Sequence, residues 1–377
     1  MTNRPAPPGG DSRARLEEAA LAIALAERPP PRERARCFES GNLEAAVSTF
    51  RRKFGEAPAG ALEAARRWRD AAAAAGRRLL ILGQPGFPPR LAEIAVPPIA
   101  LEVAGDTDLA APAVAVVGSR RATPYGIAVA ERLAAGLAEA GLAVVSGLAR
   151  GVDAAAHRAA LEAGGRTVAV LGSAHDSLYP PEHRGLARAC RASGAVLTEF
   201  PPGTRPLPHH FPRRNRIIAG LTLGTLVVEA AARSGSLATA RHAVDSGREV
   251  FAVPGPIGSD TSAGCHALIR LGAILVTGVA DILEELGLPS GSIESAADSG
   301  DVRSRKPGGA SPRPGPEAAR LLDALGKRPS GMDLDTLLGA AGLPVPVALA
   351  AISELERRGL VRRFPGDFFR GADGSLD

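Results

Sequence analysis

Lysine, cysteine and long apolar runs are scarce in this chain of 377 residues, and each scarcity excludes a class of protein. No lysine occurs between about residues 77 and 288, which excludes a lysine Schiff base or a phosphate-binding loop of the Walker type there. The three cysteines form no CxxC pair, so neither a disulfide framework nor a zinc ribbon is indicated. Since no run of about 18 apolar residues occurs, we expect no membrane span.

Aromatic residues make up only 3% of the chain, whereas hydrophobic residues make up 45%. The core must therefore be built mostly from alanine, valine and leucine. The net charge of +5 and the pI of about 9.6 permit an acidic partner without requiring one. The N-terminal stretch "MTNRPAPPGGDSRAR" lacks the apolar segment of a signal peptide, so we expect a cytoplasmic protein.

The composition changes along the chain in a way that predicts several folded parts joined by polar segments. We expect disorder over 1–14, a small helical (SAM-like) domain over 15–76, a proline-punctuated connector over 77–106, a Rossmann-like domain over 107–288, a flexible linker over 289–315 and a winged-helix domain over 316–373.

The segment 107–288 alternates short apolar runs such as "AVAVVGS" and "TVAVLGS" with longer alanine-rich runs. Strands that are apolar throughout and separated by helices are typical of a parallel sheet covered on both faces. The fold class that the sequence predicts is therefore α/β, a doubly wound parallel sheet.

Polar loops rich in glycine, serine and arginine follow the expected strands. They contain Gly118, Ser119 and Arg120 after the first strand, Gly147 and Arg150 after the second, and Arg233, Ser234 and Ser236 after "TLVVEA". Ligands of open parallel sheets bind at this edge, where backbone N–H groups and helix N-termini favour anions. For any single loop the glycine could merely form a tight turn, but the loops together predict an anion site.

The stretch "HHFPRRNRIIAG", residues 209–220, places three arginines in the expected first turn of a helix, with Pro212 as a first-turn proline. The arginines are Arg213, Arg214 and Arg216. The helix dipole favours negative charge at this end, and the stretch contains no acid, so we expect a phosphate chain as the partner.

Two further residues of this stretch suit a nucleic acid. Asn215 can hydrogen-bond a base edge or the backbone. Phe211 can stack on a base, as aromatic side chains do in single-strand binders, or it can anchor the helix by plugging the sheet edge.

Catalytic patterns are weak. Neither GxGxxG nor a Walker sequence is present, so no nucleotide cofactor is expected, and no enzyme activity is indicated. Glu199 and Glu229 follow strands, where capping or ion pairing is the favoured interpretation over catalysis. Asp153 and His157 are four residues apart on a helix, and a structural hydrogen bond is favoured over a metal site.

Several motifs occur in an order that closely resembles the DprA/Smf family: "VGSRRATPYG", "SGLARGVDAAAHRAAL", "FPRRNRIIAGL" and "ARSGSLATA" among them. The resemblance implies a homodimer that binds single-stranded DNA, loads RecA onto it and acts in natural transformation. It also implies that Arg120 corresponds to the arginine of the family's GSR loop and Phe211 to the aromatic beside the DNA. His183 and His266 stand where the family usually has asparagine.

Two alternatives remain at this point. A Rossmann-like hydrolase could hold a nucleoside monophosphate with Arg233 and cleave its glycosidic bond with Glu229. The winged helix could instead make the chain a regulator that binds duplex DNA.

Overall fold

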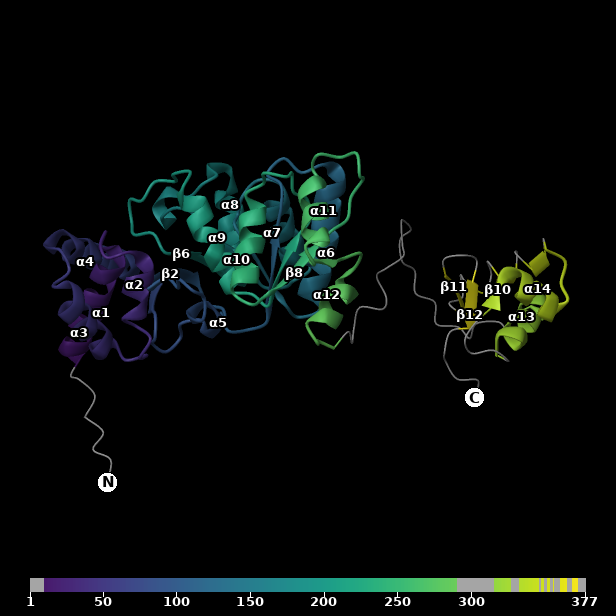
Figure 1. Cartoon of the computed structure of the whole chain (residues 1–377), viewed down its shortest axis with the longest axis horizontal. Coiled ribbons are helices and arrows are strands. Elements are labelled where there is room, and N and C mark those ends of the chain that lie inside the picture. Colours follow the sequence, from purple (N-terminus) through teal and green to yellow (C-terminus); the bar gives the residue numbers. More distant parts are fainter. Residues whose placement is uncertain are drawn as a thin grey trace, which may run out of the picture. The chain divides into compact units, whose positions relative to one another are not determined.

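The computed structural model describes residues 10–289, 315–326, 332–345, 347–348, 351–352, 355, 360–364 and 368–371. The chain forms two compact units, of which the first ends at residue 299 and the second begins at residue 300 (Figure 1). The expected linker over 289–315 lies almost entirely outside the described residues, and so do residues 1–9 of the segment expected to be disordered.

A nine-stranded sheet forms the centre of the first unit, in the order β1-β2-β6-β5-β4-β3-β7-β8-β9. The strands are β1 (Arg78–Ile81), β2 (Ala100–Gly105), β3 (Ala113–Val117), β4 (Ala143–Ser146), β5 (Thr167–Val170), β6 (Ala195–Thr198), β7 (Gly224–Val227), β8 (Glu249–Ala252) and β9 (Ile274–Leu275). Strands β3 to β9 pair in parallel, as predicted for 107–288. Strand β2 pairs antiparallel with β6, and β1 pairs antiparallel with β2.

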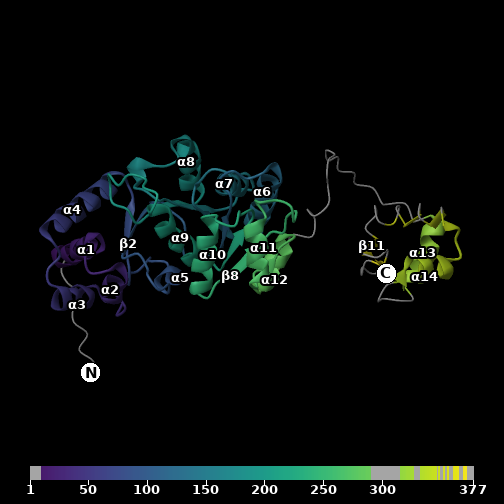
Figure 2. The ribbon, with the colours of Figure 1, turned by 45° about the horizontal axis from the view of Figure 1, so that its top comes forward.

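Helices cover both faces of this sheet, so the doubly wound prediction is confirmed (Figure 2). One face carries α6 (Pro124–Glu139), α7 (Val152–Glu162), α8 (Arg184–Ser193) and α12 (Val279–Glu285), and the other carries α5 (Pro89–Ala92), α9 (His210–Gly220), α10 (Ser236–Asp245) and α11 (Ala263–Arg270). Two short 3-10 turns, His175–Ser177 and Pro181–His183, precede α8.

The strands divide their side chains between two cores because alternate residues of a strand face opposite sides. Val114 and Val116 of β3 pack under α6 and α7, whereas Ala115 and Val117 pack toward α9 and α10. The first crossover helix begins with a side-chain cap: the Thr123 side chain accepts the Gly126 N–H at 3.1 Å, and proline follows at the first helical position.

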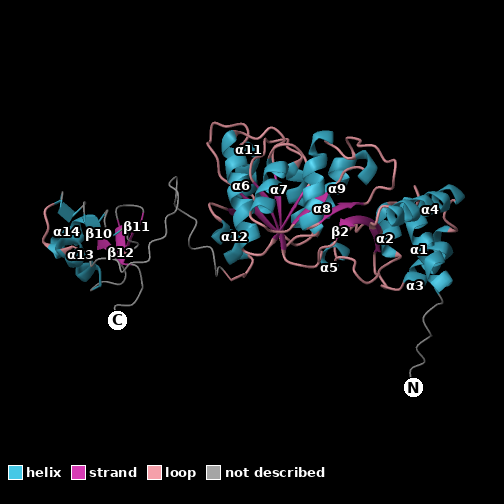
Figure 3. Ribbon diagram, turned by 180° about the vertical axis from the view of Figure 1, so that it is seen from behind, coloured by secondary structure: helices cyan, strands magenta, loops and turns pink. Residues whose placement is uncertain are grey.

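The N-terminal part is helical, as predicted, with α1 (Gly10–Leu25), α2 (Pro31–Arg36), α3 (Leu43–Phe54) and α4 (Ala59–Ala74) grouped beside β2 (Figure 3). The disorder prediction for 1–14 is wrong over 10–14, which belong to α1. These helices share their core with the sheet: buried Trp68 of α4 donates to the Glu102 carboxylate of β2 at 2.8 Å.

The connector prediction for 77–106 is also wrong, since this segment contributes β1 and β2 to the sheet. Its prolines lie between the strands rather than inside them, so they do not interrupt the sheet's hydrogen bonds.

The second unit contains α13 (Pro316–Gly326), α14 (Leu334–Ala341) and a small sheet in the order β10-β12-β11. Its strands are β10 (Met332–Asp333), β11 (Val361–Phe364) and β12 (Phe368–Gly371). Helices followed by an antiparallel β11–β12 pair fit the predicted winged helix. The third helix expected near 345–359 falls largely outside the described residues.

Candidate nucleic-acid interface

A cavity of about 770 Å³ opens at the carboxyl edge of the sheet, beside the ends of β3 and β7. The strand order reverses direction between these two strands, which is where open α/β sheets bind ligands. Nine of the expected site residues line this cavity, which we call the pocket: Gly118, Ser119, Arg120, Phe211, Arg214, Asn215, Arg233, Ser234 and Ser236.

Exposed arginines surround the pocket. Arg120 and Arg121 follow β3, and Arg233 follows β7. Among the residues that the structure describes, none of the three has an acidic partner within ion-pair distance. The helices α6, α7 and α10 also begin at this edge, and helix N-termini attract anions. The pocket therefore presents unneutralised positive charge to solvent.

Arg214 lies beneath the pocket rather than on its rim, because only 3% of it is exposed. Its guanidinium donates to the Gly147 carbonyl at 2.8 Å and to the Val170 carbonyl. Burial lowers the pKa of Arg214 to about 10, and the nearby Asp153 carboxylate opposes this shift, so Arg214 stays charged at neutral pH. A Cβ on Gly147 would come within 2.5 Å of this guanidinium, which explains the glycine there.

Phe211 is half-buried at the pocket wall and contacts other groups on several sides. The Arg120 guanidinium carbon lies 5.1 Å from the ring centroid, and the Tyr179 ring meets it edge to face at 5.8 Å. A Cβ on Gly172 would come within 2.8 Å of the ring. Phe211 therefore anchors the helix start and still presents part of its ring beside a cation, so the two interpretations of this residue are compatible.

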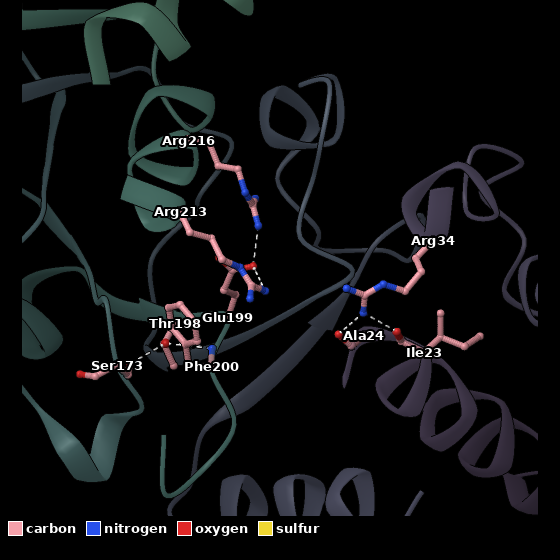
Figure 4. Close-up of polar contacts among 9 residues, drawn as sticks. All are labelled: Ile23, Ala24, Arg34, Ser173, Thr198, Glu199, Phe200, Arg213 and Arg216. Carbon is pink, nitrogen blue, oxygen red and sulfur yellow. Dashed lines mark hydrogen bonds and ion pairs between the residues drawn. The ribbon is translucent and has the colours of Figure 1, made fainter. Parts of the chain in front are cut away.

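Glu199 corrects the expectation that the arginines of α9 lack a negative partner within the chain. The carboxylate Oε2 of Glu199 accepts from Arg216 at 2.5 Å and from Arg213 at 3.0 Å (Figure 4). The neighbouring Arg34 turns instead to the carbonyls of Ile23 and Ala24 in α1. Arg213 and Arg216 are not among the residues that line the pocket, and the single Glu199 carboxylate offsets one of their two positive charges at the end of β6.

Gly147 and Arg150 lie beside the pocket, in a small adjoining hollow next to Phe211 and Tyr179. Arg150 pairs with Glu182 at 2.5 Å, with both side chains about half exposed. Its guanidinium carbon lies 5.8 Å from the Tyr179 ring centroid.

Ser234, Ser236 and Asn215 close the far side of the pocket through a small network. The two serine hydroxyls are 2.8 Å apart, and the Asn215 amide donates to the Gly235 carbonyl at 3.3 Å. Asn215 also accepts from Arg214 Nε at 3.2 Å. Asn215 is thus held between α9 and the start of α10, so its carbonyl orients the buried arginine.

The side chains weighed for catalysis or for metal binding have structural partners, which agrees with the favoured interpretation. Glu229 accepts from the backbone N–H of Thr123 at 2.9 Å and from two threonine hydroxyls. Asp153 accepts from the N–H groups of Gly147 and Ala149 and fixes the loop after β4. His157 Nδ1 lies 2.7 Å from the Thr167 hydroxyl.

Within the described part of the chain, no three metal-ligating side chains gather into a metal site. Over those same residues, no helix combines the length and apolar character that a membrane crossing requires.

The loop after β4 contains a backbone outlier that two side chains hold in place. Leu148 has a φ of 57°, which is uncommon for a branched residue. His183 Nδ1 donates to its carbonyl at 2.8 Å, while Asp153 binds the N–H groups on either side. His266 similarly donates to the Gly255 carbonyl at 2.9 Å, so both histidines fix loops near the sheet edge.

Arg121 and Tyr179 are among the pocket-lining residues that sequence reasoning missed. The signal for Arg121 was its place beside Arg120 in "GSRRATPYG". Tyr179 carried no comparable signal, because its approach to Phe211 joins segments that are distant in the chain.

The sheet order defines a Rossmann-like α/β protein, with an arginine-lined pocket at the strand-order reversal. A family model described as DNA recombination-mediator protein A matches residues 78–287, and one described as the DprA winged helix domain matches 305–367. The chain belongs to the DprA/Smf family of DNA processing proteins.

Individual relatives agree with this assignment. Protein Smf of Escherichia coli is 42% identical over 286 residues, which are 75% of this chain and 75% of that protein. DNA processing protein A of Streptococcus pneumoniae has a solved structure that is 37% identical, with a TM-score of 0.56, and the match covers 72% of this chain and 93% of that one.

The solved DNA processing protein A of Helicobacter pylori is 29% identical, with a TM-score of 0.50, and the match covers 55% of this chain and 95% of that one. Its structure was described for a single-stranded DNA binding mode.

Proposed function

We propose that this chain binds single-stranded DNA in the pocket without catalysis and acts as a recombination mediator. The observation that carries the proposal is the set of exposed arginines, Arg120, Arg121 and Arg233, which surround a cavity at the strand-order reversal and have no acid within ion-pair distance among the described residues. A chain of phosphates supplies the missing negative charge. The single-strand binding described for the Helicobacter pylori relative supports this choice.

A single strand fits the pocket better than a duplex does. The half-buried Phe211 and the exposed Tyr179 lie among the cations, and aromatic rings beside phosphate contacts bind unpaired bases. Phosphate contacts carry no sequence information, so we expect low sequence specificity.

The mediator role extends this binding to a partner. We propose that the bound strand is passed to RecA in the cytoplasm, and that the protein protects incoming DNA during natural transformation. The family description as a recombination mediator supports this proposal.

We also propose that the protein is a homodimer. Leu271 is 85% exposed and Leu275 is 46% exposed, and both lie at the edge strand β9 or just before it. Exposed leucines beside an unpaired strand edge favour self-association.

The test is a titration of oligo-dT with the double variant Arg120→Ala/Arg233→Ala at several salt concentrations. Each lost phosphate contact lowers the slope of log K against log salt by about 0.7 for a single strand, so we expect a decrease of about 1.4 and roughly tenfold weaker binding near 0.1 M salt.

The matched control is Arg132→Ala/Arg241→Ala, which removes two exposed arginines from α6 and α10 outside the pocket. The control should bind as the wild type does. Equal affinity and equal salt slope for the pocket variant and the control would refute the proposed function.

The two alternatives receive less support. Glu229, the acid that a hydrolase would use, is engaged by Thr123 and Thr261 and does not line the pocket. A regulator that binds duplex DNA would depend on the second unit rather than on the pocket.

A further inference from the structure

A second concave surface lies beside α8. It is a cavity of about 480 Å³ lined by residues of α8, β2 and β6, by Arg77 before β1 and by the segment that precedes Tyr179, and we call it the α8 groove. Its floor is apolar, formed by Ala104, Ala187 and Val196. Nothing in the pocket's chemistry uses this surface.

Arginines line one wall of the α8 groove. Arg184, Arg188 and Arg191 follow one another at spacings of four and three residues, so they project from the same face of α8. All three are exposed, and among the described residues none has an ion pair or a side-chain hydrogen bond. Like charges at this spacing destabilise a helix, so an anion bound along this face would relieve their repulsion.

The remaining ionisable groups of the α8 groove contact other parts of the chain. Arg77 pairs with the buried Glu102 at 2.5 Å. The exposed Asp176 carboxylate accepts the Gly203 N–H at 2.9 Å and keeps its negative charge. Burial lowers the pKa of His175 to about 4, and Arg77 adds to this shift, so the imidazole is neutral at pH 7. The positive charge of the groove therefore comes from the three arginines of α8, which outnumber the one carboxylate of Asp176.

The α8 groove and the pocket are joined through consecutive residues. Tyr179 lines the pocket, and Leu178, which directly precedes it, lines the groove. Arg150 lies over the Tyr179 ring at 5.8 Å and pairs with Glu182. A strand that leaves the pocket along the segment of Leu178 and Tyr179 would therefore reach the arginines of α8.

We propose that the α8 groove is a second binding segment for the same DNA strand, in which phosphodiester groups contact Arg184, Arg188 and Arg191. The inference rests on the proposed function of the pocket and extends it, since it predicts that affinity depends on strand length. Short strands occupy the pocket alone, and longer strands reach α8.

The experiment compares two oligo-dT ligands, of about 6 and about 20 nucleotides, which lie near the lower end of the usual site sizes of single-strand binders and above their upper end. Fluorescence anisotropy on the full chain gives their affinities at several salt concentrations. The double variant Arg188→Ala/Arg191→Ala should bind the short ligand within about twofold of wild type. It should bind the long ligand roughly tenfold more weakly, with a salt slope lower by about 1.4.

The control Arg132→Ala/Arg241→Ala removes the same charge elsewhere and should bind both ligands as the wild type does. A long strand offers more binding registers than a short one, and this statistical factor is equal in every variant. Comparison with the control therefore separates this factor from the effect of the α8 arginines. Unchanged binding of the long ligand by the α8 variant would overturn the proposal. Binding of 5′-dTMP at α8, with the dependence of affinity on strand length preserved, would also overturn the proposal, because the site would then hold a free nucleotide.

Failure of the proposed function would look different. In that case the short ligand would not bind the wild type, or would bind equally well after Arg120→Ala/Arg233→Ala. Loss of length dependence on the α8 variant, with normal binding of the short ligand, supports the inference specifically. Because His175 is neutral throughout, the length dependence should not change between pH 6 and pH 8.

Discussion

Glu199 is the residue on which the helix start of α9 depends. Its side chain is 4% exposed and receives two guanidinium groups, one of which, on Arg216, is only 12% exposed. A buried carboxylate and a buried guanidinium offset each other's desolvation only when they remain paired. Arg216 is therefore structural in this conformation, and we expect the loops after β3 and β7 to provide the charge that faces phosphate.

Glu199→Gln should lower the free energy of unfolding by about 3 kcal/mol, because it leaves Arg216 buried without a counter-charge. Urea unfolding followed by circular dichroism measures this change. Glu182→Gln is the matched control, since its ion pair with Arg150 is about half exposed and should contribute less than about 1 kcal/mol. Equal stability of the two variants would contradict the structural role of Glu199.

Residue types alone did not separate the exposed arginines from the paired ones. Arg120 and Arg216 both stand in basic stretches, and the difference between them is an acid at the end of β6, which sheet formation brings to α9. The sequence predicts the composition of the pocket because glycine and arginine mark strand ends. It does not predict which guanidinium is neutralised, because that depends on a contact across 17 residues of chain.

At the scale of elements, α7 is fixed to β5 by a buried histidine. The Thr167 hydroxyl donates to the Val144 carbonyl, so the His157 Nδ1–H donates to Thr167, and Nε2 is left buried without a partner in the described structure. Burial lowers the pKa of His157 to about 3, with further contributions from His183 and Arg214. A proton on Nε2 would place a charge in the core.

The unfolded chain binds this proton near pH 6.5, whereas the folded chain binds it only near pH 3. The free energy of unfolding therefore decreases as the pH falls. From the His157 shift alone we expect a loss of about 2 kcal/mol between pH 7 and pH 5. Urea unfolding at both pH values measures the difference. His157→Asn should reduce this difference by the same amount, and an unchanged pH dependence would contradict the assignment.

The strands of 107–288 could be predicted because they are apolar runs that alternate with longer helical segments. The strands β1 and β2 could not, although β2 is longer than any strand of 107–288, because a proline-rich segment that resembles a connector separates them. The antiparallel pairing of β2 with β6, and of β1 with β2, is a tertiary outcome, and the contact between Trp68 and Glu102 supports it.

At the scale of the whole molecule, the two edge strands of the sheet in the first unit differ in whether other elements cover them. The β1 edge is covered by the N-terminal helices, whereas β9 at the other edge is only two residues long and ends at an exposed Leu275. We place the dimer contact at β9 for this reason.

The variant Leu271→Glu/Leu275→Glu should be monomeric, because charge on this edge opposes burial against a second copy. Size-exclusion chromatography with light scattering measures the mass. Val345→Glu, which changes an exposed apolar residue of the second unit, is the control and should leave the dimer intact. A monomeric wild type, or a dimer that survives the double substitution, would contradict the proposed contact.

The central claim is that the pocket binds the phosphate chain of an unpaired strand. The most direct measurement compares the affinity of the full chain for single-stranded and duplex DNA of equal length across a range of salt concentrations, with wild type and Arg120→Ala/Arg233→Ala side by side. We predict tighter binding of the single strand, a linear dependence on log salt, and loss of the preference in the variant. Equal binding of both DNA forms, or a preference for single strands that the variant retains, would contradict the account.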